Sequence, residues 1–297
     1  MSKALVIFNP HAGRGRGAKR AESVVAALNA VDFEFDSVVS ETRGHAIELA
    51  QRAAESGREL IVAAGGDGTL NEVVNGVMQA RQHGVPARLG VMPIGSGNDF
   101  AGSLGITTDL RKAAEILKRD HVRRVDAGMV NGRYFANNVG MGLEAQVDIE
   151  AHKMTWVSGQ ALYLIAIFRA IRSFPHPVVQ IERDGQQIND KSILMITAGN
   201  NRRIGGGFLV FPDAVPDDGL LDLCVVDAIP RREILRLLPK LPKGKHVGEP
   251  AVEMSRFTHL VVESESPLPV HADGEILWTD ARRVEIEVLP DRLDVVA

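Results

Sequence analysis

Residues 60–76 read LIVAAGGDGTLNEVVNG, and this stretch decides the fold of the chain. The apolar run Leu60–Ala64 predicts a buried strand, and the helical spacing from Thr69 onward predicts a helix. The segment between them, Gly65-Gly66-Asp67-Gly68, predicts a tight turn. Such a turn exposes backbone N–H groups at the positive end of a helix, where phosphate binds favourably. The segment therefore predicts a nucleotide site.

Strand and helix patterns alternate from the N-terminus to Val125. This alternation predicts a parallel sheet covered by helices, with ligands at the carboxyl ends of the strands. Asn9-Pro10, Ser40 and the segment 95–98 all fall at or just after predicted strand ends, as the turn at 65–68 does. The expected strands are Ala4–Phe8, Phe33–Val39, Leu60–Ala64 and Leu89–Pro93, and the expected helices are Ala18–Leu28, His45–Ser56, Thr69–Gln79 and Leu110–Lys118.

After Val125 the pattern changes to short strands separated by turn pairs, which predicts an antiparallel, β-rich domain. The turn pairs are Asn131-Gly132, Asp184-Gly185, Asp218-Gly219 and Asp273-Gly274. We expect an α/β domain over residues 1–127, with 288–297 as a candidate to complete it, and a β-rich domain over 128–287. The cleft between them is the expected site. The expected strands are Arg133–Val139, Val178–Arg183, Ser192–Ala198, Leu220–Val226, His259–Glu263, Pro269–Ala272 and Arg283–Leu289, with helices over 156–172 and 231–239.

Composition excludes several classes of protein. A formal net charge of −4 and a pI near 6.2 argue against a nucleic-acid-binding protein. The single cysteine, Cys224, excludes an internal disulfide framework, and its apolar strand predicts a packing role in a reducing compartment. No stretch reaches about 18 uninterrupted apolar residues, so we expect no membrane span. The nearest case, Trp156–Phe174, predicts a buried or amphipathic helix that is a candidate for membrane contact.

Two further glycine-rich loops follow predicted strands. The first, Asn9–Gly17, is a weak match to a dinucleotide fingerprint and fails as a Walker A loop, so it is either a polyphosphate loop or a solvated basic turn. The loop Pro93–Phe100 contains Ser96 and Asn98, and its Asp99 fits a helix N-cap. Three glycine loops at neighbouring strand ends favour one shared nucleotide site.

Acidic groups mark two turns of the β-rich half. In Pro212–Leu220, the Asp218 side chain and nearby backbone carbonyls have the spacing to hold a hard cation, although a solvated turn fits as well. Asp273 and Glu275 flank Gly274, which is compatible with a pair of functional carboxylates or with a plain hairpin. Glu72, in the first turns of a predicted helix, has a structural role as its simplest explanation.

Together these motifs resemble the catalytic domain of diacylglycerol and sphingosine-type lipid kinases. The matching motifs are GGDGTLNEVVNG, the upstream NP-x-x-G, the downstream P-x-G-[ST]-x-N-D, PDA-x-x-DDG-x-L-D and the late DGE. GGDGT alone is shared with NAD kinases and phosphofructokinases, whereas the acidic turn and DGE favour the lipid branch. The resemblance implies an N-terminal three-layer α/β domain like that of NAD kinase and phosphofructokinase, and a C-terminal β-sandwich domain.

The resemblance also implies roles for individual residues. Either Asp273 or Glu275 would be the general base, and Asp67 and Asp126 would join an acidic network near the ATP-bound metal. A structural Mg²⁺ would be held by the carbonyls of Val215 and Leu220 and the carboxylate of Asp218. ATP contacts would fall on Asn9, Pro10, His11, Ala12, Gly13, Ser40, Gly66, Asp67, Gly68, Thr69, Leu70, Asn71, Glu72 and Ser96.

The expected activity is transfer of the γ-phosphoryl group of ATP to a lipid hydroxyl, most simply that of diacylglycerol, with Mg²⁺. The expected protein is cytoplasmic, visits the membrane surface transiently and is a candidate homodimer. The basic stretch Lys240–His246 would help it meet anionic lipid. Arg202 and Arg203 make one loop more basic than the resemblance leads us to expect. The alternatives are a kinase of a soluble substrate such as NAD, and a nucleotide-binding regulator without catalysis.

Overall fold

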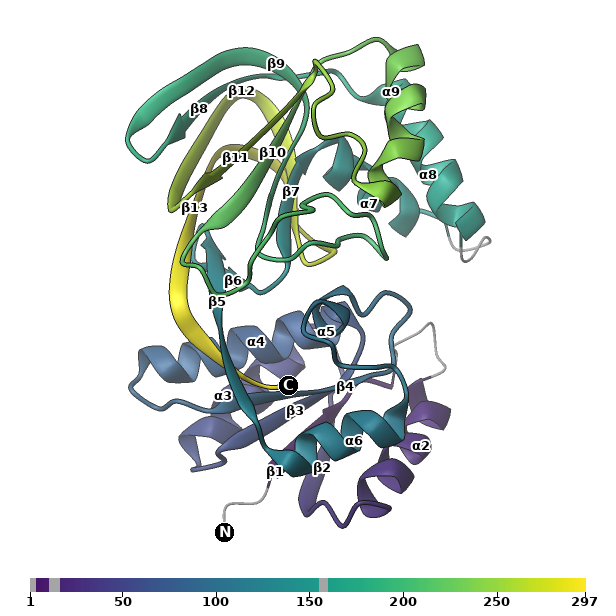
Figure 1. Cartoon of the computed structure of the whole chain (residues 1–297), viewed down its shortest axis with the longest axis vertical. Helices are drawn as coiled ribbons and strands as arrows, with labels where there is room; N and C mark the ends of the chain where they lie inside the picture. The colour runs from purple at the N-terminus through teal and green to yellow at the C-terminus, as the bar shows by residue number, and fades with distance from the viewer. Residues whose placement is uncertain (1–3, 11–16, 155–159) are drawn as a thin grey trace.

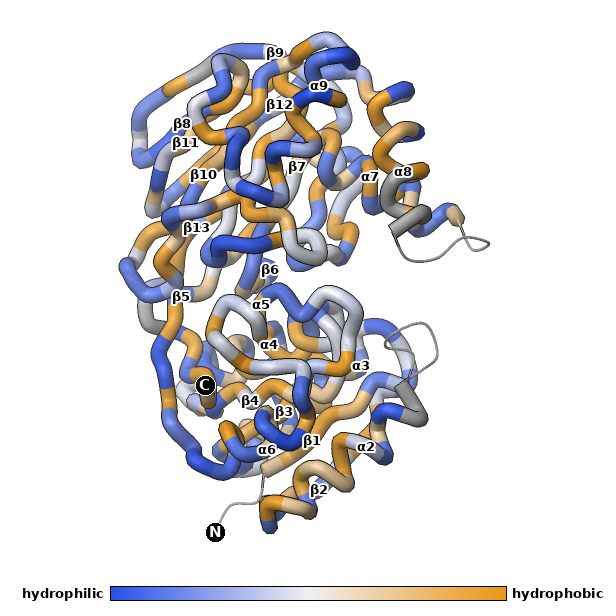
Figure 2. Tube along the Cα trace, turned by 45° about the vertical axis from the view of Figure 1, so that its right-hand side comes forward, coloured by the Kyte–Doolittle hydropathy of each residue, from blue (hydrophilic) through white to orange (hydrophobic). Residues whose placement is uncertain are grey.

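The computed structural model describes residues 4–10, 17–154 and 160–297. The elements of its N-terminal half are β1 (Ala4–Phe8), α2 (Gly17–Asn29), β2 (Phe35–Val39), α3 (His45–Glu55), β3 (Leu60–Gly65), α4 (Asp67–Gln82), β4 (Arg88–Pro93), α5 (Asp99–Ser103) and α6 (Leu110–Arg119). The strands form a parallel sheet in the order β4-β3-β1-β2. β1 and β3 are hydrophobic along their length, as Figure 2 shows. Continuous apolar strands are typical of a parallel sheet that is covered on both faces.

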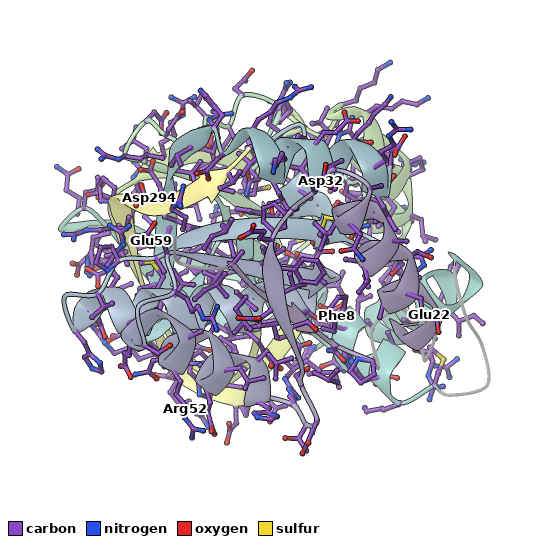
Figure 3. The ribbon with its side chains drawn as sticks, turned by 90° about the horizontal axis from the view of Figure 1, so that it is seen from below. Phe8, Glu22, Asp32, Arg52, Glu59 and Asp294 are labelled. Atoms are coloured by element: carbon purple, nitrogen blue, oxygen red, sulfur yellow. The ribbon has the colours of Figure 1, made fainter. Side chains whose placement is uncertain are left out.

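The helices cover the parallel sheet as two pairs. α3 packs on α4, and α2 packs on α6 (Figure 1). Figure 3 shows Arg52, on α3, and Asp32 on opposite sides of the sheet. The carbonyl of Asp32 accepts a hydrogen bond from Lys118 of α6, so Asp32 marks the side of the sheet that α6 covers. This three-layer arrangement brings the carboxyl ends of the strands to one edge, as the alternating sequence pattern predicts.

The C-terminal half is mainly antiparallel. Its turns Asn131-Gly132, Asp184-Gly185 and Asp273-Gly274 have positive φ at both central residues, as two-residue hairpins require. The elements are β5 (Val122–Val130), β6 (Arg133–Phe135), β7 (Asn138–Gly142), α7 (Leu143–His152), α8 (Gln160–Ser173), β8 (Val178–Arg183), β9 (Gln186–Gly199), β10 (Leu221–Asp227), α9 (Arg231–Leu237), a 3-10 helix (Leu238–Lys243), β11 (Val252–Phe257), β12 (His259–Ala272) and β13 (Glu275–Val296).

Two long strands, β5 and β13, connect the halves side by side (Figure 1). Val284 and Ile286 of β13 lie in the core of the C-terminal strands, whereas Leu293 and Val295 lie in the core of the N-terminal half. Val295 also pairs with Leu89 of β4. The end of the chain therefore returns to the N-terminal sheet. The division at residues 127 and 288 stays a prediction.

The structure departs from the predicted elements in several places: the strands β5 and β11 and the helix α5 were not among the expected elements, and two further differences have a visible cause in the sequence. Only Arg283–Leu289 of the long strand β13 was expected, because a register shift between Leu289 and Leu293 interrupts the alternating pattern. Helix α7 was not expected, because its buried Leu143, Ala145 and Val147 alternate with polar residues as in a strand. In β13 the alternation is interrupted although the strand continues, and in α7 the alternation is present although the segment is helical.

Two predictions about apolar segments have clear outcomes. In the part of the chain that the structure describes, no helix is long and apolar enough to cross a membrane. Cys224 is buried, and burial raises the pKa of its thiol to about 12, which supports a packing role.

Candidate functional site

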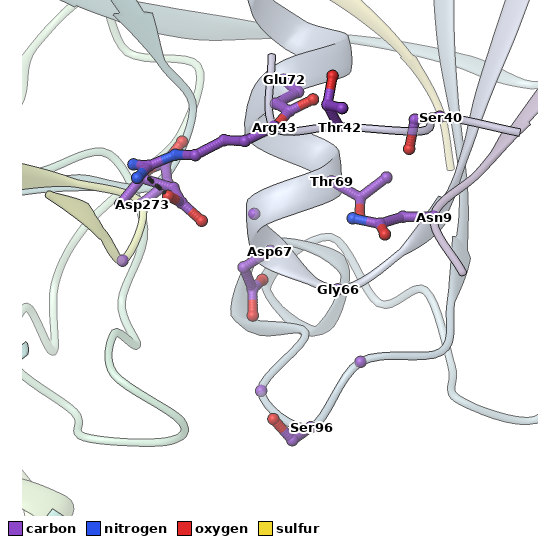
Figure 4. Close-up of a pocket in the computed structure, with 15 residues that line it drawn as sticks. Asn9, Ser40, Thr42, Arg43, Gly66, Asp67, Thr69, Glu72, Ser96 and Asp273 are labelled. Atoms are coloured by element: carbon purple, nitrogen blue, oxygen red, sulfur yellow. Dashed lines mark ion pairs between the residues drawn. The ribbon is translucent and has the colours of Figure 1, made fainter. Parts of the chain in front are cut away.

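A cleft of about 570 Å³ lies between the two halves (Figure 4). Its volume is typical of a small-molecule site. The N-terminal wall is made of strand ends and glycine turns, and the C-terminal wall is the turn between β12 and β13. The lining residues are Asn9, Ser40, Thr42, Arg43, Gly66, Asp67, Gly68, Thr69, Glu72, Gly95, Ser96, Gly97, Asp273, Gly274 and Glu275.

The glycine turns of the N-terminal wall touch each other through their backbones. A Cβ atom on Gly95 would lie 2.3 Å from the Cα atom of Gly66, and a Cβ atom on Gly66 would lie 3.0 Å from the Cα atom of Gly95. α4 begins at Asp67, so its first-turn amides, which a helix leaves without intrahelical partners, lie at the cleft. The wall therefore presents backbone N–H groups and a partial positive charge.

Asp67 points into this wall with one carboxylate oxygen unsatisfied. Its Oδ2 accepts a hydrogen bond of 2.7 Å from the amide of Asn98, whereas its buried Oδ1 has no hydrogen-bond partner among the described residues. Burial, together with the nearby carboxylate of Asp99, raises the pKa of Asp67 to about 6. A divalent cation would satisfy the free oxygen and favour the ionised carboxylate, so Asp67 fits a metal ligand.

Asp99 is not the helix N-cap that the sequence suggests. The N-cap of α5 is Asn98, in a left-handed conformation, and Asp99 is the first helical residue. The Asp99 carboxylate instead accepts a hydrogen bond of 2.6 Å from the amide of Gly206 in the C-terminal half. Burial raises the pKa of Asp99, although Arg203 partly opposes this. Arg203, one of the two arginines that make its loop unusually basic, thus lies near the Asp99 carboxylate.

Glu72 has the structural role that its position suggests, but on a different helix. Its Oε1 accepts a hydrogen bond of 2.8 Å from the amide of Gly44, and its Oε2 accepts one of 3.1 Å from the amide of Ala46. These amides belong to the start of α3, where a carboxylate is favourable. Glu72 therefore anchors the loop that follows β2, which carries Thr42 and Arg43 into the cleft.

The two candidate bases differ sharply in their surroundings. Asp273 is 6% exposed, and its carboxylate accepts four hydrogen bonds of 2.9–3.0 Å from the Asn71 side chain and three backbone amides. The three amides are those of Ala136, Asn137 and Asn138. All the main acceptor positions of a carboxylate are thereby filled. Asp273 is built as an anchor for the turn.

Glu275, in contrast, faces the cleft. Its side chain is 32% exposed, and its Oε2 lies 2.6 Å from Nη2 of Arg43 on the opposite wall (dashed line in Figure 4). A Cβ atom on Gly68 would lie 2.7 Å from Glu275 Oε1, so the end of the Glu275 side chain lies directly against this glycine of the N-terminal wall. Sequence reasoning did not identify Arg43, because nothing in the local pattern connects it with residue 275.

The remaining predicted ATP residues divide into three groups. Asn9, Ser40, Thr69 and Ser96 line the cleft, whereas Pro10 is outside its lining. Leu70 and Asn71 are buried, and Asn71 acts through its hydrogen bond to Asp273. The predicted contacts at His11, Ala12 and Gly13 lie outside the described residues.

The predicted structural metal site lies away from the cleft, at the turn 212–220. Asp218 Oδ1 accepts a hydrogen bond of 3.1 Å from the amide of Leu220, and its Oδ2 lies 3.6 Å from Arg256. Asp126 accepts a hydrogen bond of 2.8 Å from the amide of Gly219, so it belongs to this turn and not to the cleft lining. Within the described ranges, no group of three acidic, histidine or cysteine side chains has an arrangement that could hold a metal ion. A Mg²⁺ ion here would be held by one carboxylate, carbonyls such as those of Val215 and Leu220, and water, which fits its chemistry.

Comparisons with known proteins agree with this architecture. The sequence model of the diacylglycerol kinase catalytic domain matches residues 3–130, and that of the YegS C-terminal NAD kinase beta sandwich-like domain matches residues 137–297. A Staphylococcus saprophyticus protein named diacylglycerol kinase is 31% identical over 274 residues, which are 92% of this chain and 88% of the relative. A Bacillus subtilis protein of the same name is 31% identical over 278 residues, covering 93% and 90%.

The fold agrees as well. A crystal structure of a Bacillus anthracis protein, provisionally described as a diacylglycerol kinase, matches with a TM-score of 0.80 at 26% identity and covers 99% of this chain and 96% of that one. The cleft thus lies between two domains that occur together in full-length relatives, and the chain belongs to the diacylglycerol kinase catalytic-domain family.

Proposed function

We propose that this protein is an ATP- and Mg²⁺-dependent lipid kinase that phosphorylates a lipid hydroxyl, that of diacylglycerol or a closely related lipid. The relatives named diacylglycerol kinase support this acceptor class. The observation that carries the proposal is the position of Glu275, a partly exposed carboxylate in contact distance of Gly68 in the phosphate-binding turn. A base beside the phosphates of a nucleotide is what phosphoryl transfer to a hydroxyl requires.

We assign the two walls different tasks. The first-turn amides of α4 and the polar groups of Asn9, Ser40 and Ser96 bind ATP, and Asp67 with Asp99 beside it would hold Mg²⁺ near the phosphates. When bound, Mg²⁺ neutralises phosphate charge. Catalysis in this reaction class is mainly positioning and charge neutralisation, for which backbone amides in a fixed turn are well suited.

We assign the general base to Glu275, because the four donors on Asp273 leave that carboxylate no free position. The lipid hydroxyl oxygen attacks the γ-phosphorus while its proton passes to the Glu275 carboxylate. The bond from the γ-phosphorus to the β–γ bridging oxygen breaks, and its electron pair leaves with ADP. Asp273 holds the turn that presents Glu275.

A panel of acceptors with labelled ATP tests this function. Diacylglycerol and related lipids in mixed micelles should acquire the label, and NAD, offered in parallel, should not. Glu275→Gln should lower kcat by about 10²–10⁴-fold, because general-base catalysis contributes that much. Glu263→Gln, the same change at an exposed residue of β12, should leave kcat unchanged. Label on NAD alone, or full activity of Glu275→Gln, would overturn the proposal.

We also propose that the enzyme acts from the cytoplasm on the surface of a membrane, where its substrate resides. Within the stretch 240–246, Lys240 pairs with Glu249 at 2.5 Å and His246 is buried, so Lys243 and Lys245 are its exposed cations. Replacing both lysines should weaken sedimentation with anionic vesicles, since each contributes about 1 kcal/mol near such a surface. Unchanged sedimentation would remove this stretch from the membrane contact. A homodimer stays a prediction that sedimentation equilibrium can test.

A further inference from the structure

We propose that Arg43 is a second catalytic side chain of the cleft, which leaves Glu275 and binds the γ-phosphoryl group when ATP binds. The inference rests on the proposed function and deepens it. In the structure, Arg43 extends from the loop after β2 across the cleft to the turn between β12 and β13 (Figure 4). Its Nη2 lies 2.6 Å from Glu275 Oε2 and donates a hydrogen bond of 3.3 Å to the carbonyl of Ile276.

The backbone of Arg43 is held in place while its side chain is free to turn. Glu72 binds the amides of Gly44 and Ala46 on the C-terminal side of Arg43. The Arg43 side chain itself is 69% exposed, so little packing restrains it beyond its two contacts with the far wall. Because the backbone of Arg43 is fixed and its side chain is long and exposed, the guanidinium can exchange partners without rearrangement of the loop.

The charges of the cleft favour such a cation beside the phosphates. Among the described residues of its lining, four carry carboxylates and one, Arg43, carries a positive charge. A nucleoside triphosphate brings several further negative charges to the same place. The carboxylates in the lining are those of Asp67, Glu72, Asp273 and Glu275.

The position of Glu275 also places Arg43 next to the phosphate-binding turn. Glu275 Oε1 lies so close to Gly68 that a Cβ atom there would be 2.7 Å away, and Glu275 Oε2 is bound to Arg43. The guanidinium is therefore one carboxylate away from the turn. A short rotation of the side chain would bring it to a phosphoryl group bound at Gly68.

The exchange has a favourable direction and a useful consequence. A solvent-exposed ion pair is weak, whereas a guanidinium binds a phosphate through two charge-assisted hydrogen bonds. ATP would thus draw Arg43 away from Glu275. The base would lose its counter-charge and become free to accept the proton of the acceptor at the moment when the γ-phosphoryl group gains a stabilising cation.

Nucleotide binding and turnover of Arg43→Ala, Arg43→Lys and a control test the exchange. The control is Arg52→Ala, which removes another exposed, paired arginine, bound to Glu48 at 3.0 Å on α3. Dissociation constants for a non-hydrolysable ATP analogue and for ADP are measured with Mg²⁺, and kcat is measured with the lipid acceptor. Arg43→Ala should weaken the ATP analogue at least fivefold more than ADP and lower kcat at least tenfold, and Arg43→Lys should recover part of both. Arg52→Ala should change neither.

Equal effects of Arg43→Ala on the two nucleotides, or an unchanged kcat, would overturn the inference, because a static ion pair has no preference for the γ-phosphoryl group. This result leaves the proposed function intact as long as the wild-type protein binds ATP and labels a lipid. A wild-type protein that binds neither nucleotide, or labels no lipid, refutes the proposed function instead.

Discussion

The two walls of the cleft are built in different ways. The N-terminal wall consists of short runs of consecutive residues at the ends of neighbouring parallel strands, and it combines glycine turns with polar side chains. The C-terminal wall consists of residues on one hairpin turn, which is held by donors as far away as Asn71, 202 positions earlier in the chain. The N-terminal wall is therefore encoded mainly by local sequence, whereas the C-terminal wall depends on long-range contacts.

The largest expected effect is on the anchored carboxylate of the C-terminal wall. Asp273→Ala leaves four donors without their acceptor in a buried place. Each such group costs about 1–3 kcal/mol, so we expect the free energy of unfolding to fall by roughly 4 kcal/mol or more in total, with loss of activity. Denaturant titration followed by fluorescence measures this.

Glu275→Gln is the matched control for Asp273→Ala, because it changes the other carboxylate of the same turn. Its partner, Arg43, is exposed, so the stability of this variant should stay within about 1 kcal/mol of the wild type. Asp273→Ala with wild-type stability would show that Asp273 is not an anchor, and the assignment of the base to Glu275 would lose its main support.

Two glycines of the N-terminal wall distinguish packing from catalysis. Gly95→Ala brings a Cβ atom to 2.3 Å from the backbone of Gly66, which cannot yield locally, so we expect a loss of about 2–4 kcal/mol in stability. Gly68→Ala meets only the end of the Glu275 side chain, which can move. The free energy of unfolding of Gly68→Ala should stay within about 1 kcal/mol of the wild-type value, but the variant should lose most of its activity. Equal destabilisation in both variants, measured by denaturant titration, would contradict this separation.

The same difference explains how far the sequence alone leads. The order of strand, glycine turn and helix over residues 60–76 was predicted correctly, because these elements are adjacent in the chain, but the turn is shorter than predicted: β3 ends at Gly65 and α4 begins at Asp67. The choice between Asp273 and Glu275 stayed open, since their partners come from Asn71, the segment 136–138 and Arg43. No local pattern carries this information.

Asp99 shows a related limit of sequence reasoning. The N-cap interpretation was wrong because the preceding residue, Asn98, adopts the left-handed conformation and takes the N-cap position itself. The partner of Asp99 is the amide of Gly206, 107 positions away, in the other half of the molecule. A cap motif predicts a local bond, and here a long-range bond prevailed.

The C-terminal wall should also lose stability as the pH rises. His271, two residues before the anchored Asp273, lies 3.1 Å from Glu144 and 3.7 Å from Asp148 through its two ring nitrogens. Burial would lower the pKa of His271, but Glu144, Asp148 and Asp273 raise it to about 9. The raised pKa means that the folded protein holds this proton more tightly than the unfolded chain does, so its contribution is complete below about pH 6.5 and is lost as the pH rises through 9.

We therefore expect the free energy of unfolding to fall by up to about 3 kcal/mol between pH 6.5 and 9. Denaturant titrations at both pH values measure the change. In His271→Gln, which has no proton to lose, this part of the pH dependence should disappear. A slope that persists in the variant would assign the effect to other groups.

The smallest expected effect concerns Asp67 of the N-terminal wall, where a substitution should raise the free energy of unfolding and not lower it. The raised pKa of Asp67, about 6, means that protonation of Asp67 favours the folded state. The resulting stability is complete below about pH 3.8 and is lost as the pH rises through 6, so at pH 7 the folded protein carries an unfavourable buried charge.

Asp67→Asn keeps an oxygen for the Asn98 amide and removes the charge, so it should gain about 1–3 kcal/mol in stability at pH 7 while losing activity. Thermal or denaturant unfolding at pH 7 and pH 4 measures this, and the gain should shrink at pH 4, where wild-type Asp67 is largely protonated. A variant less stable than wild type at pH 7 would show that Asp67 supports the fold. A gain in stability, together with the loss at Asp273, would show that the phosphate wall holds its carboxylate for function and the reactive wall holds its carboxylate for structure.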